Sequence, residues 1–498
     1  MAMLWERIME IALQRSFFYP ANEQYSAPSG FYDYGPVGVL MKRKIENLWR
    51  TQFIYELGNY EVESAIVTPE IVLKASGHVD NFTDPIVDCP KCRKKMRADH
   101  FAEEKIHGFK WDGKIESLKK IYSTNKEKMI CPCGGEIKEP WIFNLMFKTM
   151  IGGDVASGFL RPETAQGIFT AFVRLFKNQG AKLPLAVGQV GRSFRNEISP
   201  RNVLVRMREF TQMELEYFFN PSKQSIEGFD KIKNYKIRYL PREGQKGSFR
   251  DVQETCIGEL INKKVCNEIF GFFLAKEWEY YRLCGLDMDR CAFRHLLEGE
   301  TPHYSKGNVD MEIETSYGII ETIGNAYRTN FDLSQHQNYS KKDFSVFVED
   351  EKKKVIPHVF EVSMGVDRMF FSILEHAFRE KSKEKDWEWF DFPPAIAPYE
   401  VAVFPLMKKD GLSEKANNVA AKLRSNWMVL YSESGSIGRR YARADEIGTP
   451  YAITIDYETL ENDSVTIRYR NDSKQERVQI SELDAKIKNN IESGRKTL

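Results

Sequence analysis

Two short stretches of the sequence place charged residues at every second position, as in β-strands that show one polar face. Arg195 and Glu197 share a face of the first expected strand, and Arg206, Phe210 and Glu214 share a face of the second. Arginine forks donate paired hydrogen bonds to phosphate oxygens, and an aromatic ring stacks on a flat base. A carboxylate such as Glu197 accepts from an exocyclic amine. The pattern therefore predicts a hairpin that holds a nucleoside triphosphate.

The second strand of this hairpin has one apolar face and one polar face. Burying arginines and carboxylates without a ligand is costly, which favours a binding site, and the alternative is an outer sheet face open to solvent. The residues expected to face a core are Met207, Thr211, Met213, Leu215, Tyr217 and Phe219, and those expected on the polar face are Arg206, Arg208, Phe210, Gln212, Glu214 and Glu216.

The elements that must position this hairpin belong to a chain too long for one core. With 498 residues, two or three domains are expected. Lysines dominate residues 88–140, where a cysteine pair stands at each end, and residues 222–308 are lysine-rich and then helical. We interpret both as insertions, and we expect no strand of the second one beside the hairpin. The catalytic domain then consists of residues 1–87, 141–221 and 309–392.

The last part of the chain has a different pattern. Three prolines in residues 391–399 are typical of a linker, and strands alternate with helices beyond it. This alternation predicts a small α/β domain over 393–498. Strands are expected at 401–406, 428–433, 451–455 and 464–469, and helices at 414–425, 437–447 and 480–491.

Composition limits the partners. Lys plus Arg (72) nearly equals Asp plus Glu (71), so a polyanion must be met by a local patch. Glu6, Arg7, Glu10 and Arg15 interrupt the apolar start, so a signal peptide is not expected, and no uncharged apolar run is long enough for a membrane span.

The cysteines indicate a reducing compartment, because eight in so long a chain are too few for a disulfide scaffold. Cys89, Cys92, Cys131 and Cys133 form two pairs that can close a tetrahedral zinc site and so fold a hydrophilic insertion. Reduced buried thiols are the alternative, since a Cys-x-Cys pair is a less common zinc clasp.

Five longer motifs, in order, resemble those of class II aminoacyl-tRNA synthetases, and most closely the glycyl-tRNA synthetases of the dimeric archaeal and eukaryotic type. They span nearly the whole chain. The motifs are GFYDYGPVGVLMKRKIENLW (30–49), GFLRPETAQGIF (158–169), the hairpin with FRNEISPR (194–201) and REFTQMELEYF (208–218), EVSMGVDR (361–368), and GSIGRRYARADEIGTPY (435–451).

The resemblance implies an α+β fold, with a six- or seven-stranded antiparallel sheet flanked by helices and a C-terminal α/β anticodon-binding domain. A bent ATP is expected on the sheet, with Arg195 on its α-phosphate, Arg206 and Arg368 on the outer phosphates, and Phe210 stacked on adenine opposite Arg368. The other residues implied near ATP and its Mg²⁺ are Asn196, Glu197, Glu321, Thr322 and Gly365.

Glycine recognition is implied by a second set of residues. Glycine has no side chain to bind, so its ammonium, with three donors, must supply the affinity. The family pattern surrounds it with Glu163, Glu214 and Glu361, three carboxylates that suit a cation. A closed wall then excludes larger amino acids without an editing domain. The pattern also puts Ser363 near the α-carbon and Arg97 near the amino acid.

Three features of the sequence depart from this family pattern or lie outside it. Tyr327 replaces the usual acidic residue before Arg328, so a role for Arg328 beside the α-phosphate stays open. Glu216 is expected to be a surface or ion-paired carboxylate. A glycine pair in IGGDVASG (151–158) replaces glycine-proline and is expected to alter only a loop.

The implied activity is ATP-dependent attachment of glycine to its tRNA through glycyl-adenylate, in a cytoplasmic homodimer. Arg439, Arg440 and Arg443 on one helix resemble part of an anticodon-binding domain, with a solvated basic helix as the alternative. The lysines of residues 222–308 suggest contact with the tRNA acceptor stem. The alternatives are an inactive nucleic-acid-binding relative and a class II synthetase for another small amino acid.

Overall fold

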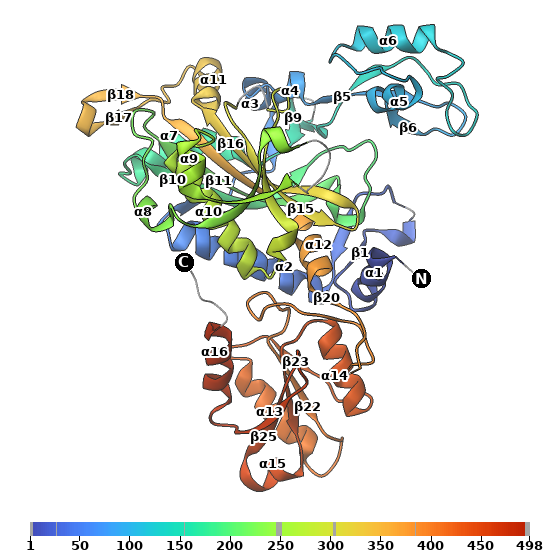
Figure 1. Ribbon diagram of the computed structural model, residues 1–498, viewed down its shortest axis with the longest axis vertical. Coiled ribbons are helices and arrows are strands. Elements are labelled where there is room, and N and C mark those ends of the chain that lie inside the picture. Colours follow the sequence, from blue (N-terminus) through green and yellow to red (C-terminus); the bar gives the residue numbers. More distant parts are fainter. Residues whose placement is uncertain are drawn as a thin grey trace.

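The computed structural model describes residues 3–25, 27–153, 155–245, 251–301, 305–383 and 385–493. Figure 1 shows a large body around one sheet, a small domain projecting from its upper corner, and a separate α/β domain below. Asp154, within the altered glycine loop, lies outside the described residues.

The large body is built on one nine-stranded sheet. Its six central strands, β14-β15-β16-β19-β11-β10, pair antiparallel, as expected, while β3 and β12 join the two sides in parallel. The strands, in sheet order, are β13 (Gln253–Cys256), β12 (Lys236–Leu240), β14 (Cys291–His295), β15 (Val309–Thr315), β16 (Gly318–Thr329), β19 (His358–Gly365), β11 (Glu209–Phe219), β10 (Leu185–Phe194) and β3 (Tyr60–Glu61).

The expected hairpin is β10 and β11. Its register pairs Ser193 with Phe210 and Gln189 with Glu214. The odd-numbered residues of β11 face the main apolar core, where Met213 and Leu215 are fully buried. The alternation therefore separated the two faces, and the even-numbered Phe210, Gln212 and Glu214 line the site.

Three helices cover the core face of the sheet (Figure 1): α2 (Pro36–Trp49), α10 (Glu268–Leu283) and α12 (Val366–Ala377). The amphipathic helix α2 buries Met41, Ile45, Leu48 and Trp49 in this core. A smaller cluster joins α7 (Ala165–Asn178) and α11 (Phe331–Ser340) to one end of β10, β11 and β19.

As expected, no strand of residues 222–308 lies beside the hairpin, but the segment is not purely helical, because it contributes β12, β13 and β14 to the far side of the main sheet. Their short, charged sequences hide the strand pattern: Lys236–Leu240 alternates only over five residues. With β3, these strands enlarge the expected six- or seven-stranded sheet to nine strands. Lys246–Arg250 of this segment lie outside the described residues.

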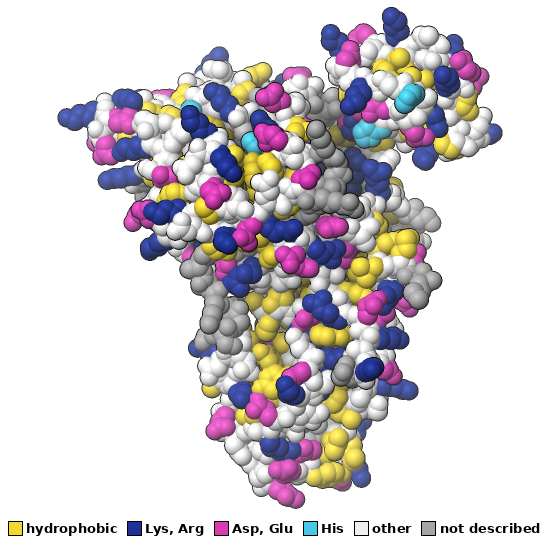
Figure 2. All heavy atoms as spheres, viewed as in Figure 1, with side chains coloured by type: hydrophobic (Ala, Val, Ile, Leu, Met, Phe, Trp, Pro, Cys, Tyr) yellow, Lys and Arg dark blue, Asp and Glu magenta, His cyan; other side chains and the backbone are white. Residues whose placement is uncertain are grey.

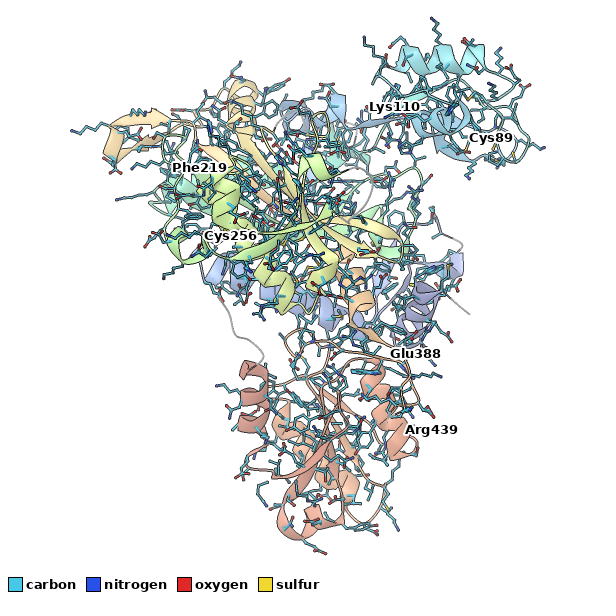
Figure 3. All side chains as sticks on the ribbon, viewed as in Figure 1. Cys89, Lys110, Phe219, Cys256, Glu388 and Arg439 are labelled. Atoms are coloured by element: carbon cyan, nitrogen blue, oxygen red, sulfur yellow. The ribbon has the colours of Figure 1, made fainter. Side chains whose placement is uncertain are left out.

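The cysteine pairs lie in the small upper domain, where Cys89 is labelled in Figure 3. A three-stranded sheet, β6-β5-β7, packs here with two helices around its own apolar cluster. The elements are β5 (Thr83–Asp88), β6 (Lys95–Arg97), α5 (Ala98–Lys105), α6 (Ile115–Thr124) and β7 (Trp141–Asn144).

The lower domain has the predicted alternation of strands and helices. Its sheet has the order β23-β22-β24-β25-β26, and its core is separate from that of the body. Sequence patterns missed α15 (Tyr457–Asn462) and β26 (Gln475–Gln479), which are short and polar. The others are β22 (Val401–Pro405), α13 (Leu412–Leu423), β23 (Val429–Tyr431), α14 (Ile437–Glu446), β24 (Tyr451–Ile455), β25 (Ser464–Tyr469) and α16 (Leu483–Ser493).

Basic and acidic side chains alternate over the face seen in Figure 2, in keeping with a net charge of +1. Among the described residues, no helix is long and apolar enough to cross a membrane.

Candidate active site

A cavity of about 360 Å³ lies over the polar face of the central strands. Strands β11, β15, β16 and β19, the start of α12 and the segment between β10 and β11 supply most of its walls. Twelve of the predicted site residues line it: Glu163, Arg195, Glu197, Arg206, Phe210, Glu214, Glu321, Thr322, Glu361, Ser363, Gly365 and Arg368.

One end of the cavity carries the three predicted arginines. Arg206 donates from Nε to Glu197 Oε2 at 2.7 Å, and its Nη2 lies 2.6 Å from the same oxygen. Because its guanidinium remains 30% exposed, it can still meet a ligand in the cavity. Glu197 therefore orients an arginine as well as facing the ligand space.

Arg195 lies between two aromatic rings. Its guanidinium carbon is 5.2 Å from the centre of the Phe210 ring and 5.4 Å from that of Phe82, and its Nε donates to the Pro162 carbonyl at 3.2 Å. In this structure Arg195 therefore contacts the ring that is expected to stack on adenine. An adenine base stacked on Phe210 must therefore share that ring with Arg195.

Arg368 is held by backbone carbonyls where β19 turns into α12. It donates to Val205 O at 3.1 Å and to Glu321 O at 2.8 Å, while its side chain stays 37% exposed. Its neighbour Asp367 accepts from Tyr34 Oη at 2.5 Å and from the Thr211 amide at 2.6 Å. These bonds tie the start of α12 to β11, so the positions of Arg368 and Phe210 are linked.

Two lining residues near Glu321 were not predicted. Asp310 is 6% exposed, and burial, reinforced by the charge of Glu321, raises its pKa to about 8. Asn308 is also buried, and its Oδ1 has no hydrogen-bond partner among the described residues. The alternating acids of VDMEIE (309–314) had the same polar-face pattern as the hairpin, and this signal was available in the sequence.

The other end of the cavity carries carboxylates. Glu214 is almost completely buried and accepts from Ser363 Oγ at 2.6 Å, from Gln212 Nε2 at 2.8 Å and from the Thr164 amide at 2.8 Å. The Thr164 hydroxyl is a further donor. Burial and the charge of Glu163 together raise the pKa of Glu214. Its donors fix it in place without supplying a positive charge.

Glu361 has a buried cationic partner, Arg328. Nη1 of Arg328 donates to both oxygens of Glu361, at 2.9 and 3.0 Å, and its Nε and Nη2 donate to Asp332 at 2.8 and 2.9 Å. Burial raises the pKa of Glu361 to about 8, Arg328 opposes this rise, and Glu163 and Glu214 add to it. Arg328 is thus a counter-ion within the carboxylate cluster, which sequence reasoning did not foresee.

Glu163 is held from two sides. Its Oε1 accepts from Gln166 Nε2 at 2.9 Å, and its Oε2 lies 3.4 Å from His78 Nε2. Burial opposes its ionisation, but the charges of His78 and Arg328 outweigh burial and lower its pKa. His78 was missed because a lone histidine at the start of a four-residue helix, α4 (His78–Asn81), carries no pattern.

The interpretation of Glu216 as a surface or ion-paired carboxylate was wrong. Its side chain is fully buried, and neither oxygen has a hydrogen-bond partner among the described residues. The register puts it beside Glu361, one row deeper than Glu214. Burial and the charge of Glu361 raise its pKa well above the ordinary value, which favours the neutral form.

Two predicted residues do not line the cavity. Arg97 belongs to the small upper domain, where it pairs with Asp84 at 2.6 Å and also with Asp99. Asn196 donates its backbone amide to Leu145 O at 2.6 Å. The main sheet therefore does not bring Arg97 to the end of the cavity that carries the carboxylates.

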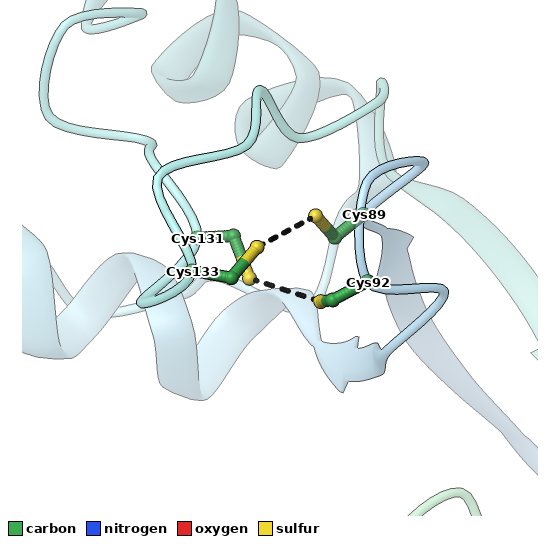
Figure 4. A group of neighbouring side chains, drawn as sticks. All are labelled: Cys89, Cys92, Cys131 and Cys133. Atoms are coloured by element: carbon green, nitrogen blue, oxygen red, sulfur yellow. Dashed lines mark hydrogen bonds between the residues drawn. The ribbon is translucent and has the colours of Figure 1, made fainter.

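The four cysteines of the upper domain converge (Figure 4). Their sulfur atoms all lie within 4.8 Å of one another, with Cys89 and Cys133 at 3.5 Å and Cys92 and Cys131 at 3.6 Å. The backbone amide of Cys92 lowers the pKa of Cys89 to about 6, so a thiolate is available at neutral pH. Two turns thus bring both cysteine pairs together, at a spacing that suits four ligands around one tetrahedral metal ion.

The three arginines of α14 have different environments. Arg439 is exposed on the side of the lower domain (Figure 3), and Arg443 is half-buried. Arg440, in contrast, is only 3% exposed and donates to backbone carbonyls, so it is not part of a solvated basic face.

Comparisons with known proteins agree with this architecture. Residues 154–377 match the family model "tRNA synthetase class II core domain (G, H, P, S and T)", and residues 400–490 match "Anticodon binding domain". A crystal structure of prolyl-tRNA synthetase from Cryptosporidium parvum superposes with a TM-score of 0.59 at 12% identity, covering 99% of this chain and 76% of that one. The fold and the site therefore define a class II aminoacyl-tRNA synthetase.

Curated relatives narrow the class further. The glycine–tRNA ligase of Methanocaldococcus jannaschii is 39% identical, over 96% of this chain and 98% of its own. That of Methanococcus maripaludis is 36% identical over 98% of this chain and the whole of its own, and that of Methanothermobacter thermautotrophicus is 36% identical over 96% and 97%. The chain belongs to the glycine–tRNA ligase family, as its motifs indicated.

Proposed function

We propose that the protein activates glycine with ATP, forming glycyl-adenylate and pyrophosphate, and transfers glycine to a ribose hydroxyl at the 3′ end of its tRNA, releasing AMP. The observation that carries the proposal is the charge distribution of one cavity. Glu163, Glu214 and Glu361 line its amino-acid end, while its other end holds the three arginines. A small zwitterion and a polyphosphate can therefore meet head to head.

In this proposal the glycine ammonium binds among the three carboxylates. The glycine carboxylate then attacks the α-phosphorus directly, so no general base is needed, and the enzyme acts by positioning and charge stabilisation. Arg195 holds the α-phosphate, Arg206 and Arg368 hold the outer phosphates, and Phe210 supports adenine. Glu321 lies where it can hold the Mg²⁺ that accompanies ATP, with Thr322 beside it.

Selectivity for glycine follows from enclosure of the same end. Glu214 and Ser363 are hydrogen-bonded to each other at 2.6 Å, and Gln212 donates to both. A side chain on the substrate α-carbon must displace part of this connected wall. Larger amino acids are thus rejected by overlap, and no editing domain is required.

The remaining partners follow from the same proposal. The α/β domain over residues 400–490 binds the anticodon stem-loop of the tRNA, and the protein works in the cytoplasm as a homodimer whose interface includes α2. The lysine-rich segment 222–308 contacts the acceptor stem, and unchanged footprints after its deletion would remove that idea. Asn196 and Arg97 approach the substrates only with the upper domain closed on the cavity.

A structural zinc ion in the upper domain completes the proposal. Zn–S bonds of about 2.3 Å in a tetrahedron separate the sulfurs by about 3.8 Å, close to the 3.5 and 3.6 Å found between Cys89 and Cys133 and between Cys92 and Cys131. These cysteines would hold the ion as thiolates and cross-link two turns of a domain with a small core.

Aminoacylation of total tRNA from a related archaeon tests the function. Purified protein with ATP, Mg²⁺ and labelled glycine should form an alkali-labile glycyl-tRNA. Labelled alanine and serine should give none. Absence of glycyl-tRNA together with RNA binding would favour a non-catalytic relative instead.

A further inference from the structure

A second cavity, of about 340 Å³, lies at the junction between the catalytic body and the lower domain. We call it the junction cavity. The end of α1 (Leu4–Gln14) and the start of α2 supply its upper wall, and β22, β23 and α14 supply the lower one. Three arginines line it, and no described carboxylate does. The lining residues are Gln14, Arg15, Ser16, Pro36, Val37, Phe404, Leu430, Tyr431, Ser432, Arg440, Arg443 and Ile447.

Arg440 is a buried charge with no carboxylate partner among the residues that the structure describes. Its guanidinium donates to the carbonyl oxygens of Pro405, Leu406 and Ser432, the last two at 3.2 and 3.4 Å. Its Nε is buried and has no acceptor among the described residues. Burial lowers its pKa, and the positive charge of Arg443 acts in the same direction. A buried cation of this kind is stabilised when an anion binds beside it.

The start of α2 adds a second attraction for an anion. Pro36 and Val37, its first residues, line the cavity, and Gly35 offers no side chain to cap the helix. Pro36 has no N–H and the Gly38 amide donates to Ser16 O at 3.4 Å, so the Val37 amide and the positive dipole end of this 14-residue helix are what the start of α2 offers to the same space.

The remaining charges around the cavity leave it positive. Arg15 pairs with Glu446, which also feels the charge of Arg443, and Arg443 donates to Ser434 O at 3.0 Å. Glu433 accepts from Tyr431 Oη at 3.0 Å. Arg440 and Arg443 are thus held by backbone oxygens, so their charges are available to a ligand.

We propose that the junction cavity binds a phosphate-type oxyanion, coordinated by Arg443 and Arg440 and by the start of α2. Because its walls come from two domains, the anion links them and favours one relative orientation. The source is either a free phosphate or the phosphate of a nucleotide. This inference does not depend on the aminoacylation chemistry.

Thermal unfolding and calorimetry of the full chain test the proposal. Inorganic phosphate should raise the melting temperature in a saturable way, beyond chloride at equal ionic strength. Arg443→Gln should weaken phosphate binding by about 10- to 150-fold, the value of one charge-assisted hydrogen bond of about 1.5–3 kcal/mol. Arg439→Gln is the matched control: it lies on the same helix, does not line the cavity, and should change binding by less than about twofold.

Further measurements identify the source of the anion and control for misfolding of the variants. Because the catalytic cavity also takes phosphate groups, all of these measurements are made in an Arg206→Ala background. If a 5′-nucleoside monophosphate then binds more tightly than phosphate while the nucleoside alone does not bind, the ligand is a nucleotide phosphate. Equal binding indicates free phosphate. Arg440→Lys keeps the charge with fewer donors and should give an intermediate loss. Phosphate binding that survives in Arg443→Gln, or falls equally in Arg439→Gln, overturns the proposal.

Discussion

Replacing Glu361 with Gln tests whether the carboxylate cluster recognises an ammonium group. The amide keeps the size of the side chain and can still accept from Arg328, which retains its two bonds to Asp332 at 2.8 and 2.9 Å. At a pH above about 8, where Glu361 is ionised, what disappears is one negative charge at the amino-acid end of the cavity. We expect the variant to fold and to bind glycine weakly.

The magnitude follows from the contact that is lost. One charge-assisted hydrogen bond contributes about 1.5–3 kcal/mol, so the KM for glycine should rise by about 10- to 150-fold. The KM for ATP should change by less than about threefold, because Glu361 lies at the opposite end from the arginines. Glycine-dependent exchange of labelled pyrophosphate into ATP measures both constants.

Glu375→Gln provides the matched control. Glu375 is also a buried carboxylate on an arginine, with Arg290 Nη2 at 2.6 Å, but it belongs to α12 and does not line the cavity. Both variants should lose stability, and only Glu361→Gln should lose glycine affinity. Equal glycine KM values in the two variants, or a loss shared by glycine and ATP, would refute the reasoning.

Three other predictions concern the pH dependence of glycine binding, the contact of Arg206 with ATP, and the metal. Because burial raises the pKa of Glu361 to about 8 and ammonium binding requires its ionised form, the glycine KM should fall as pH rises from about 6.5 to 8. A flat profile in the wild type, or an unchanged slope in Glu361→Gln, would contradict this. Arg206→Ala should raise the KM for ATP by about 10- to 150-fold, whereas Arg192→Ala, an exposed pair with Glu209, should have little effect on exchange kinetics. Purified protein should contain zinc by emission spectroscopy, and Cys131→Ser should lose it and expose residues 88–140 to proteolysis; full metal content in that variant would exclude the four-cysteine site.

The hairpin and its ligand face were predictable because the signal is local. Side chains alternate with a period of two along a strand, so the sequence of β11 alone separates Met213 and Leu215 from Glu214. Family motifs then extended this face to Arg368, at the start of a helix far along the chain. The C-terminal alternation succeeded for the same reason, since each of its core elements carries its own apolar pattern.

The partners inside the site were not predictable in this way. Arg328 meets Glu361 across two strands, and His78 meets Glu163 from a separate short helix. Such contacts depend on register and tertiary packing, which no window of sequence contains. Glu216 was misjudged because alternation shows which face a residue occupies and gives no measure of how deeply that face is covered.

The environment of the α14 arginines at the junction between the domains could not be predicted from the sequence either. The sequence shows Arg439, Arg440 and Arg443 as a basic cluster on one helix. Only packing of α14 against β22 distinguishes the buried Arg440 from the exposed Arg439. Arg440 and Arg443 therefore line the junction cavity, whereas Arg439 remains on the surface.

Pyrophosphate exchange with a panel of amino acids tests the central claim most directly. With ATP and Mg²⁺ present, glycine should support rapid exchange, while alanine, serine, threonine and proline should support none above background. Exchange with another amino acid at the rate found for glycine would contradict the assignment of the carboxylate end, and no exchange with any of them would contradict the proposed catalysis.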